Sequence, residues 1–415
     1  MKKAAAIGLT TALAVLGSTA ASEARDNNRT GGGEHVNVAT IEGVDPTGAR
    51  DSSGAISAAI KSGARQLSFP CGRFLIAQTI LLPSGSQVTG RGECSILATS
   101  KSIQGNPHWA SLNVAYPKGM PAGVFSNEDW KGGNANIEIR DLVLDGRAGT
   151  DGGRRIYLAA FVRTRDVVVR GVRFLGAEND DVQIGAAFLA SRNFRITDNY
   201  ASGERSACYG VWDGSHNFVI SDNVCDGKGV SSGGVVVNGI GTNNEPERST
   251  SALVARNVVR NTRDTGIFVG GLWNGNPDGP VYGGVEDAVV ENNSVTNVSD
   301  YHGILISDGK NIVVRANRVA NTAHQGIRVG SQFHGVTSQV VVEGNSIANA
   351  GVKDRNADAV RVTNGAESVS IRGNSVSGRT HRFGVRVDKD VRRATVSPGA
   401  TTEGWMGGVS DSSRR

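Results

Sequence analysis

A histidine and an arginine lie at comparable points of two neighbouring copies of a repeated sequence. His302 stands directly before the Gly-Ile pair at 303–304, and Arg328 directly follows the Gly-Ile pair at 326–327. A cation beside an uncharged imidazole suits removal of a proton next to a carboxylate, because the cation neutralises the acid while the imidazole accepts the proton. Tyr209 and Tyr301 are candidate proton donors. These four residues predict a β-eliminating lyase or a C5-epimerase of uronic acids.

Carboxylates that suit acid–base hydrolysis form a second candidate set. Asp180 and Asp181 are adjacent, and Asp213 or Asp264 can supply a partner from a later repeat. Inverting hydrolysis of a glycosidic bond needs two carboxyl groups about 6.5–9.5 Å apart, which nearby coils can provide. The same aspartates can instead cap turns. Asp180, Asp181 and Asp213 are also conceivable calcium ligands, but their spacing matches no recognisable ligand pattern, so no metal site is predicted.

The elements that must position these side chains follow from a repeat between about residues 137 and 391. A β-branched run and a Gly-Ile or Gly-Val run return every 24 to 36 residues, a period typical of a solenoid. Short strands with glycine and asparagine at the corners favour an all-β, single-stranded right-handed parallel β-helix. Its coils begin near Asn136, Asp166, Asn193, Asn217, Ser251, Asp287, Asn311, Gln339 and Ser368.

An asparagine recurs a few residues after the first run of most coils. The column consists of Asn199, Asn223, Asn257, Asn293, Asn317, Asn345 and Asn374. Stacked side-chain amides at equivalent positions bond to their counterparts on the coils above and below. The column therefore predicts an asparagine ladder inside the solenoid.

The second run of each coil predicts an outward-facing surface, because residues alternate in and out along a strand. The position before the glycine holds Asp180, Tyr209, Gly233, Thr265, His302, Gln325, Asp358 and Phe383, and the position two after it holds Gln183, Trp212, Val236, Phe268, Leu305, Arg328, Arg361 and Arg386. Candidate substrate-binding residues are Gln183, Trp212, Phe268 and Arg361. Since strands stack about 4.8 Å apart, we expect His302 and Arg328 to be close.

The ends of the chain predict export. Residues 1–24 have the layout of a secretory signal peptide, with two lysines, a short apolar stretch and small-x-small cleavage sites at 18–20 and 22–24. Residues 25–36 are expected to form a flexible leader, residues 37–397 the β-helix and residues 398–415 a tail without the repeat. No other segment is long and apolar enough to span a bilayer. We therefore expect one secreted or periplasmic domain.

The cysteine count predicts disulfides, and the net charge limits the classes of ligand that the protein could bind. Four cysteines suit disulfides in an exported chain; of the three possible pairings, Cys71–Cys94 with Cys208–Cys225 is preferred, the latter two lying 17 residues apart on neighbouring coils. The formal charge of +5 is compatible with an anionic polysaccharide as partner. Nucleic acid is not expected, because basic residues form no block and no binding motif is present. The oligomeric state stays open.

Residues 43–92 resemble the N-terminal segment of the pectate-lyase-like superfamily of β-helix proteins. G-V-D-P-T-G-A-R-D-S at 43–52 precedes an Ala- and Ile-rich stretch at 55–60, and L-S-F-P-C-G-R-F-L-I at 67–76 is similar to that superfamily's first coil. The resemblance implies a short amphipathic helix that covers the open end of the solenoid. It implies no single activity, because the superfamily contains lyases, epimerases, hydrolases, tailspikes and structural members.

Two shorter motifs resemble particular families. Y-G-V-W-D-G-S-H at 209–216 is similar to the signature of mannuronan C5-epimerases, with Trp212 in the place of an aspartate. Y-H-G at 301–303 and G-I-R-V at 326–329 are similar to motifs of polygalacturonases, with Gly330 in the place of a lysine. The leading prediction is an exported lyase or C5-epimerase; a polygalacturonase-like hydrolase and a non-catalytic polysaccharide-binding protein are the alternatives.

Overall fold

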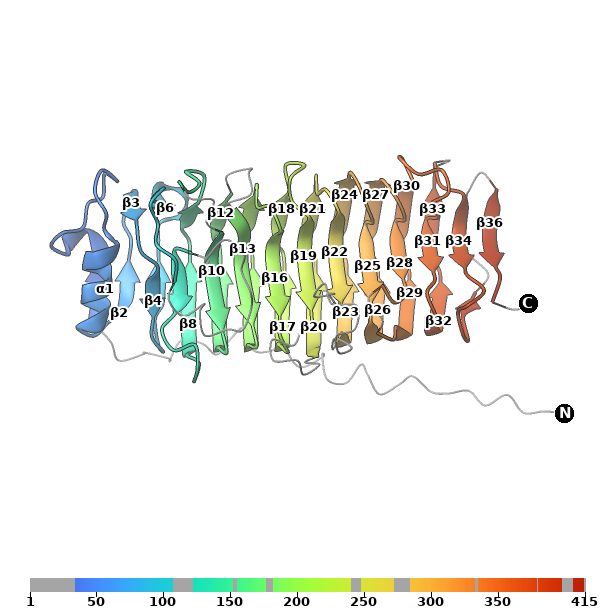
Figure 1. Ribbon diagram of the computed structural model, residues 1–415, viewed down its shortest axis with the longest axis horizontal. Coiled ribbons are helices and arrows are strands. Elements are labelled where there is room, and N and C mark those ends of the chain that lie inside the picture. The colour runs from blue at the N-terminus through green and yellow to red at the C-terminus, as the bar shows by residue number, and fades with distance from the viewer. Residues whose placement is uncertain are drawn as a thin grey trace.

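Stacked coils form one elongated solenoid in the computed structural model (Figure 1). The structure describes residues 34–106, 122–151, 155–176, 182–239, 248–271, 284–332, 335–378, 380–397 and 406–413. All strand pairs in these residues are parallel, and each full coil adds one strand to each of three long sheets. The right-handed parallel β-helix predicted from the repeat is confirmed. Among the described helices, none is long and apolar enough to cross a membrane.

Three sheets, called A, B and C in the order in which a coil visits them, contain all the described strands. Sheet A comprises β1 (Glu34–Asn37), β2 (Ala64–Ser68), β5 (Gln87–Thr89), β8 (Ala135–Arg140), β11 (Arg165–Arg170), β14 (Arg192–Thr197), β17 (His216–Ser221), β20 (Ser249–Ala255), β23 (Val285–Glu291), β26 (Gly309–Arg315), β29 (Ser338–Glu343), β32 (Glu367–Arg372) and β35 (Thr395–Val396). Sheet B comprises β3 (Gly72–Ile76), β6 (Ser95–Thr99), β9 (Val143–Asp145), β12 (Arg173–Leu175), β15 (Tyr200–Ser202), β18 (Val224–Asp226), β21 (Val258–Arg260), β24 (Ser294–Val298), β27 (Arg318–Thr322), β30 (Ser346–Ala350) and β33 (Ser375–Ser377). Sheet C comprises β4 (Ile80–Leu82), β7 (Phe125–Asn127), β10 (Ile156–Val162), β13 (Val182–Leu189), β16 (Ala207–Trp212), β19 (Gly233–Asn238), β22 (Thr265–Gly270), β25 (Ile304–Ser307), β28 (Ile327–Val329), β31 (Val360–Val362), β34 (Phe383–Val387) and β36 (Gly407–Asp411).

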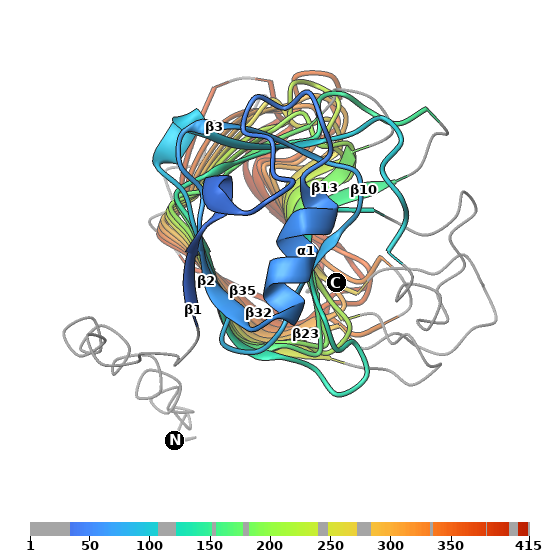
Figure 2. The ribbon, with the colours of Figure 1, turned by 90° about the vertical axis from the view of Figure 1, so that its left-hand side faces the viewer.

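The N-terminal end of the solenoid is occupied by α1 (Ser53–Lys61), which lies across the opening of the first coils (Figure 2). Its residues Ile56 and Ile60 are 0% and 4% exposed and join the apolar core. Two short 3₁₀ turns, Val38–Thr40 and Gly92–Cys94, complete this region. The helix therefore buries the apolar face that its sequence pattern predicted.

The solenoid extends beyond both of its predicted ends. Residues 34–36, assigned to the leader, belong to β1, which pairs with β2. Part of the tail continues sheet C, because β36 pairs with β34 from Phe383↔Gly407 to Val387↔Asp411. The predicted signal peptide lies outside the described residues.

Every residue predicted to begin a coil adopts a left-handed backbone. The φ angles of these nine residues lie between 52° at Asn217 and 58° at Asn136 and Asp287. At these positions the strand pairing of sheet A omits one residue on each strand. For example, Arg165 pairs with Arg192 and Val167 with Phe194, whereas Asp166 and Asn193, which lie between them, are not paired. Asparagine and aspartate tolerate this conformation better than most residues. The recurring polar residue is thus a consequence of backbone shape.

The predicted asparagine ladder is confirmed over all seven positions. The Oδ1 atom of Asn293 accepts from the backbone N of Asn257 at 2.9 Å and from its Nδ2 at 3.0 Å. Its Nδ2 donates to the Asn317 Oδ1 at 3.0 Å and to the Val254 carbonyl at 2.9 Å. Since Asn293 is 1% exposed, these bonds satisfy polar groups that water cannot reach.

Both predicted disulfides are present, Cys71–Cys94 and Cys208–Cys225. Cys208 occupies the corner where neighbouring coils have Gly234 and Gly266, as the alignment of β16 with β19 and β22 shows. A Cβ at Gly234 would lie 2.3 Å from Val259, and one at Gly266 2.2 Å from Val295. Cys225 stands in the column of those valines. The disulfide therefore replaces a glycine–valine contact between coils.

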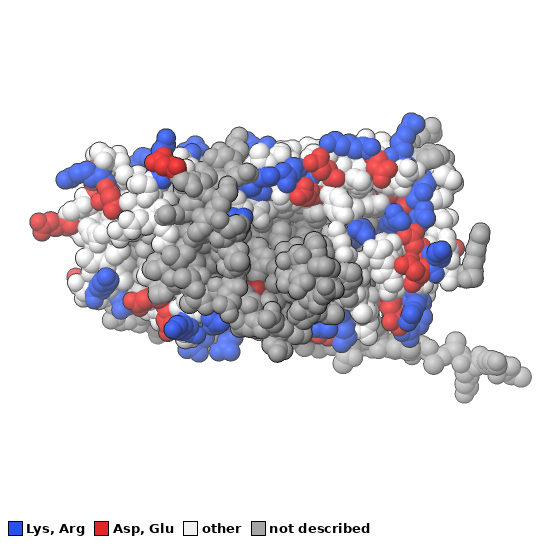
Figure 3. All heavy atoms as spheres, in the orientation of Figure 1, with Lys and Arg blue, Asp and Glu red and all other residues white. Residues whose placement is uncertain are grey.

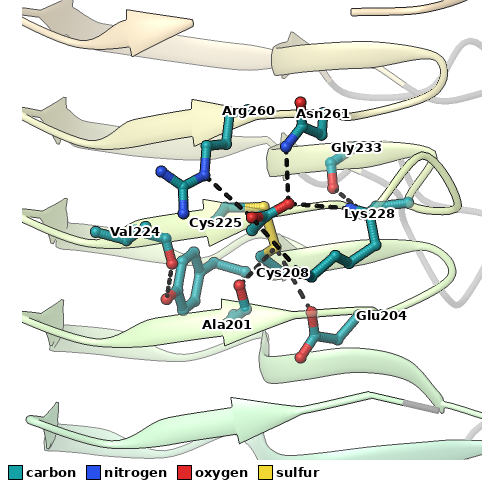
Figure 4. Close-up of a disulfide and its surroundings, with 12 residues drawn as sticks. Ala201, Glu204, Cys208, Val224, Cys225, Lys228, Gly233, Arg260 and Asn261 are labelled. Carbon is teal, nitrogen blue, oxygen red and sulfur yellow. Dashed lines mark hydrogen bonds and ion pairs between the residues drawn. A yellow bond between two sulfur atoms is a disulfide. The ribbon is translucent and has the colours of Figure 1, made fainter. Parts of the chain in front are cut away.

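Glu204 lies beside this disulfide, with its Oε2 3.6 Å from the Cys208 Sγ (Figure 4). The side chain is 0% exposed, and its Oε1 has no hydrogen-bond partner. Burial raises the pKa of this carboxyl from 4.5 to about 8. Glu204 is therefore protonated at neutral pH in the folded protein.

Replacing one ladder asparagine should destabilise the solenoid. Asn293→Ala removes both donors and the acceptor of that side chain and leaves buried partners on two coils unpaired, at about 1–3 kcal/mol for each unpaired group. We expect a loss of roughly 2–5 kcal/mol in the free energy of unfolding, measured from urea melts. The control is Asn297→Ala in an exposed row of asparagines, where Asn297 Nδ2 bonds Asn261 at 3.2 Å. An equal loss in both variants would contradict the buried ladder's role.

Glu204→Gln should change the pH dependence of stability. The unfolded carboxyl ionises above pH 4.5, whereas the folded one stays protonated to about pH 8, so ionisation favours unfolding between these values. The wild type should lose about 1.4 kcal/mol per pH unit relative to Glu204→Gln across that window. Thermal melts at several pH values measure the difference, with the exposed Glu42→Gln as control. Parallel pH profiles for wild type and Glu204→Gln would refute the buried acid.

Candidate functional site: the outer face of sheet C

A column of side chains runs along the outer face of sheet C in register. Val236 pairs with Phe268, Phe268 with Leu305, Leu305 with Arg328, Arg328 with Arg361, and Arg361 with Arg386. The order predicted for this stretch is confirmed. The face is therefore apolar in its middle and cationic toward the C-terminal end.

The predicted register is wrong for the coil that contains Tyr209. Tyr209 pairs with Ala186 and Val235, two residues away from the predicted alignment with Gly233, which pairs instead with Ala207. The ring is 0% exposed in the core, its hydroxyl donates to the Val224 carbonyl at 3.1 Å, and burial raises its pKa well above 10. Tyr209 is therefore part of the core and does not face a substrate.

The same misalignment displaces Gln183 and Trp212. Ala187, and not Gln183, occupies the column of Val236, because Ala187 pairs with Gly210 and Gly210 with Val236. Gln183 lies four residues earlier, near the start of β13.

Trp212 and Phe268 differ as candidate sugar-stacking residues. The Trp212 ring folds back over Gly210, since a Cβ there would lie 1.9 Å from it, and it packs on an outer apolar cluster that includes Trp130 and Leu189. Part of this ring remains exposed. Phe268 lies on the outer face but is only 7% exposed. Trp212 is thus the more accessible aromatic surface of the two.

A compact polar group surrounds His302, which lies at the start of sheet C's strands. The ring centroids of Tyr301 and His302 are 3.9 Å apart, and His324 of the next coil lies 5.6 Å from Tyr301 and 5.9 Å from His302. The Tyr301 hydroxyl accepts from the Gln332 Nε2 at 3.1 Å and also contacts the Arg328 guanidinium. The charge of Arg328 acts on His302 from the next coil, in agreement with the predicted proximity of these two residues, and Tyr301 joins them.

His302 is an uncharged base at neutral pH. Burial, followed by the charge of Arg328 and smaller contributions of His324 and Arg361, holds its pKa well below 6.5. The side chain is 3% exposed, and neither ring nitrogen has a hydrogen-bond partner. Buried polar atoms are normally paired, so two unpaired nitrogens on one imidazole make His302 a candidate functional residue.

His324 and Gln332 are members of this group that the column analysis missed. His324 stands two residues before Gly326, as Tyr301 does before Gly303 and Asp264 before Gly266. Comparing residues at that offset would have aligned Asp264, Tyr301 and His324 on successive coils. Gln332 follows β28 and carries no periodic signal.

Cations beyond Arg328 are paired with carboxylates. Arg361 and Arg386 both bond Asp388, at 2.8 Å and 2.7 Å. Arg382 bonds the buried Asp358 at 3.1 Å. Figure 3 shows the resulting mixture of positive and negative side chains at the C-terminal end of this face. Arg361, a predicted substrate-binding residue, is therefore largely engaged within the protein.

The predicted pairing of Asp180 and Asp181 with Asp213 or Asp264 for hydrolysis stays a prediction. Asp264 directly precedes β22 and bonds Arg263 at 3.1 Å, whereas Asp213 directly follows β16. The two residues therefore lie at opposite ends of six-residue strands, which span about 20 Å. Asp180 and Asp181 lie outside the described residues. Within the described part of the chain, no group of three or more His, Cys, Asp or Glu side chains could hold a metal ion.

Comparisons with known proteins agree with this architecture. Residues 270–381 match the family model of the right-handed β-helix region. A search of curated proteins finds no match.

Three solved structures illustrate the range of similar folds. The A-module of the mannuronan C-5 epimerase AlgE6 of Azotobacter vinelandii is 16% identical, with a TM-score of 0.65 over 91% of this chain and 98% of that one. A family 28 exopolygalacturonase of Yersinia enterocolitica is 14% identical, with a TM-score of 0.64 over 91% and 78%. PfbA, a surface adhesin of Streptococcus pneumoniae, is 13% identical, with a TM-score of 0.62 over 90% and 91%.

The family model matches part of the chain, and the solved structures share the right-handed parallel β-helix fold over about nine tenths of it. At these identities the similarity establishes the fold, while the activity must be argued from the site.

Arg328→Gln should raise the pKa of His302. Removing the neighbouring positive charge makes protonation of the imidazole less unfavourable, so the charged form appears at higher pH than in the wild type. The measurement is an NMR titration of the His302 ring between about pH 4 and 8. Arg318→Gln, on sheet B, is the control. An unchanged His302 titration in Arg328→Gln would show that the two residues are not electrostatically coupled.

Proposed function

We propose that this protein is an exported enzyme that abstracts the C5 proton of a uronate residue in a polysaccharide, as a β-eliminating lyase or a C5-epimerase. His302 is the base, Arg328 the group that neutralises the sugar carboxylate, and Tyr301 the proton donor. The observation that carries the proposal is an uncharged, unpaired imidazole in contact with a tyrosine ring and close to an arginine.

Each role follows from the state of the side chain. Arg328 remains a cation because guanidinium groups do not deprotonate in proteins. Its charge, placed at a uronate carboxylate, acidifies the adjacent C5–H bond and stabilises the enolate-like charge that develops as the proton leaves. His302 has a lowered pKa and so carries no proton that would have to be lost first.

Tyr301 links the base to the cation. Its hydroxyl contacts Arg328 and Gln332, while its ring packs on His302. The hydroxyl can give a proton either to the leaving glycosidic oxygen in elimination or to the opposite face of C5 in epimerisation. Because His302 is 3% exposed, substrate access requires a rearrangement of the side chains packed on it, Tyr301 among them.

Export and a carbohydrate partner are supported by independent features. Two disulfides suit an oxidising compartment, and the first 24 residues have the layout of a signal peptide. The similar solved structures include a mannuronan epimerase and an exopolygalacturonase, whose names identify uronate polymers as their substrates.

His302→Gln should abolish turnover while leaving the fold intact. Loss of a general base lowers the rate by about 10²–10⁴-fold, and loss of the carboxylate-neutralising cation in Arg328→Gln should cost on the order of 10²-fold. His35→Gln, an exposed histidine on β1, is the matched control. Unfolding midpoints confirm that each variant is folded.

The assay must distinguish three reactions. Polyuronates are incubated with the mature protein while ultraviolet absorbance of unsaturated uronate, new reducing ends and exchange of the C5 hydrogen with solvent are followed together. Elimination produces the absorbance, and epimerisation produces exchange alone. Reducing ends without absorbance would replace the proposal with hydrolysis, and silence in all three readouts would leave a binding protein.

A further inference from the structure

A cleft of about 820 Å³ lies at the corner where coils pass from sheet C to sheet A. Its lining includes four arginines, Arg163, Arg165, Arg192 and Arg248, and one acid, Asp213; Arg248 also bonds Glu286 outside the lining at 3.5 Å. The lining residues come from six successive coils between Ser84 and Arg248, so at about 4.8 Å per coil the cleft runs roughly 24 Å along the solenoid.

Two arginines in this cleft stand directly opposite each other without compensation. Arg165 pairs in register with Arg192, and Arg192 with His216. Within the described part of the chain, neither arginine has an ion pair or a side-chain hydrogen bond. Like charges on directly opposed positions of adjacent strands are destabilising.

Elsewhere on sheet A the protein pairs charges that face each other across coils. Further along the same column, Lys310 bonds Glu286 at 2.7 Å. At the other edge of the sheet, Arg315 bonds Glu291 and Arg372 bonds Glu343, both at 2.6 Å. Arg140 and Arg170 are a second in-register pair of like charges on this sheet, but Arg140 lies beside Glu138 and Asp141, whereas Arg165 and Arg192 have no carboxylate partner among the described residues.

The backbone that presents these side chains is rigidly held. The Thr164 N–H donates to the Ser191 Oγ at 3.0 Å, the Ser191 N–H to the Ser215 Oγ at 3.1 Å, and the Ser215 N–H to the Ser249 Oγ at 3.2 Å. All four residues are buried. This hydroxyl ladder fixes the coil-to-coil spacing of the arginines without using their own side chains.

We propose that this cleft binds a segment of an acidic polysaccharide, at a site separate from the His302 group. Arg165, Arg192 and Arg248, on three of the six coils, match a polymer that carries a carboxylate on each repeating unit, and the length of the cleft suits an extended chain. The inference shares its polymer class with the proposed function, but it requires no turnover.

The test is the binding of polygalacturonate, with dextran as the neutral polymer, measured by affinity electrophoresis at low ionic strength. Arg165→Glu/Arg192→Glu should weaken polygalacturonate binding at least tenfold, and Arg165→Lys/Arg192→Lys should retain most of it. The matched control is Arg318→Glu/Arg392→Glu, which makes the same change in net charge at exposed sites outside the cleft and should stay within twofold of wild type. The difference should shrink as salt rises.

The inference is separated from the proposed function by the binding readout, because Arg165→Glu/Arg192→Glu should weaken polygalacturonate binding by the same factor with or without His302→Gln, even if no turnover is ever detected. Equal weakening by the cleft and control variants would overturn the cleft site. Binding of double-stranded DNA without binding of polygalacturonate would also overturn it.

Discussion

Register between stacked coils is the constraint on which the rest of this molecule depends. Every coil must repeat the backbone path of the one before it, so each position along the coil becomes a column of side chains about 4.8 Å apart. Left-handed residues at the coil starts and the buried asparagine ladder keep that path constant. A side chain therefore acts through its column neighbours more than through its neighbours in sequence.

Periodic features of the fold could be predicted because each has a local physical cause. The coil starts carry Asn, Asp, Ser or Gln at a backbone position with positive φ, and the ladder needs an amide on each coil. Both leave a mark in the sequence wherever they occur. The cysteine pairing was equally accessible, since Cys208 and Cys225 fall on consecutive coils.

The register error at Tyr209 has a specific origin in the same disulfide. The glycine that marks the corner in neighbouring coils is required because a β-branched side chain of the next coil approaches it closely. In the Cys208 coil the disulfide takes the place of that contact, so the marker glycine is absent. Gly210-Val211, in the middle of β16, then imitates it. Contacts made on a single coil, such as that of Gln332 with Tyr301, cannot be found by periodicity.

Arginines stacked along sheet C differ in whether a carboxylate pairs with them. Along the outer face of sheet C, Arg361 and Arg386 share Asp388, whereas Arg328 contacts the Tyr301 hydroxyl and faces an unpaired imidazole. Pairing with a carboxylate would cancel the charge that, after burial, lowers the pKa of His302, and would compete with an acidic ligand for the guanidinium. Asp388 neutralises Arg361 and Arg386, but no carboxylate neutralises Arg328 beside His302 among the described residues. A local positive potential therefore remains at the coil that carries Arg328. A polyuronate lying along the face would place one sugar carboxylate there, so the position of Arg328 along the solenoid would select which sugar unit reacts.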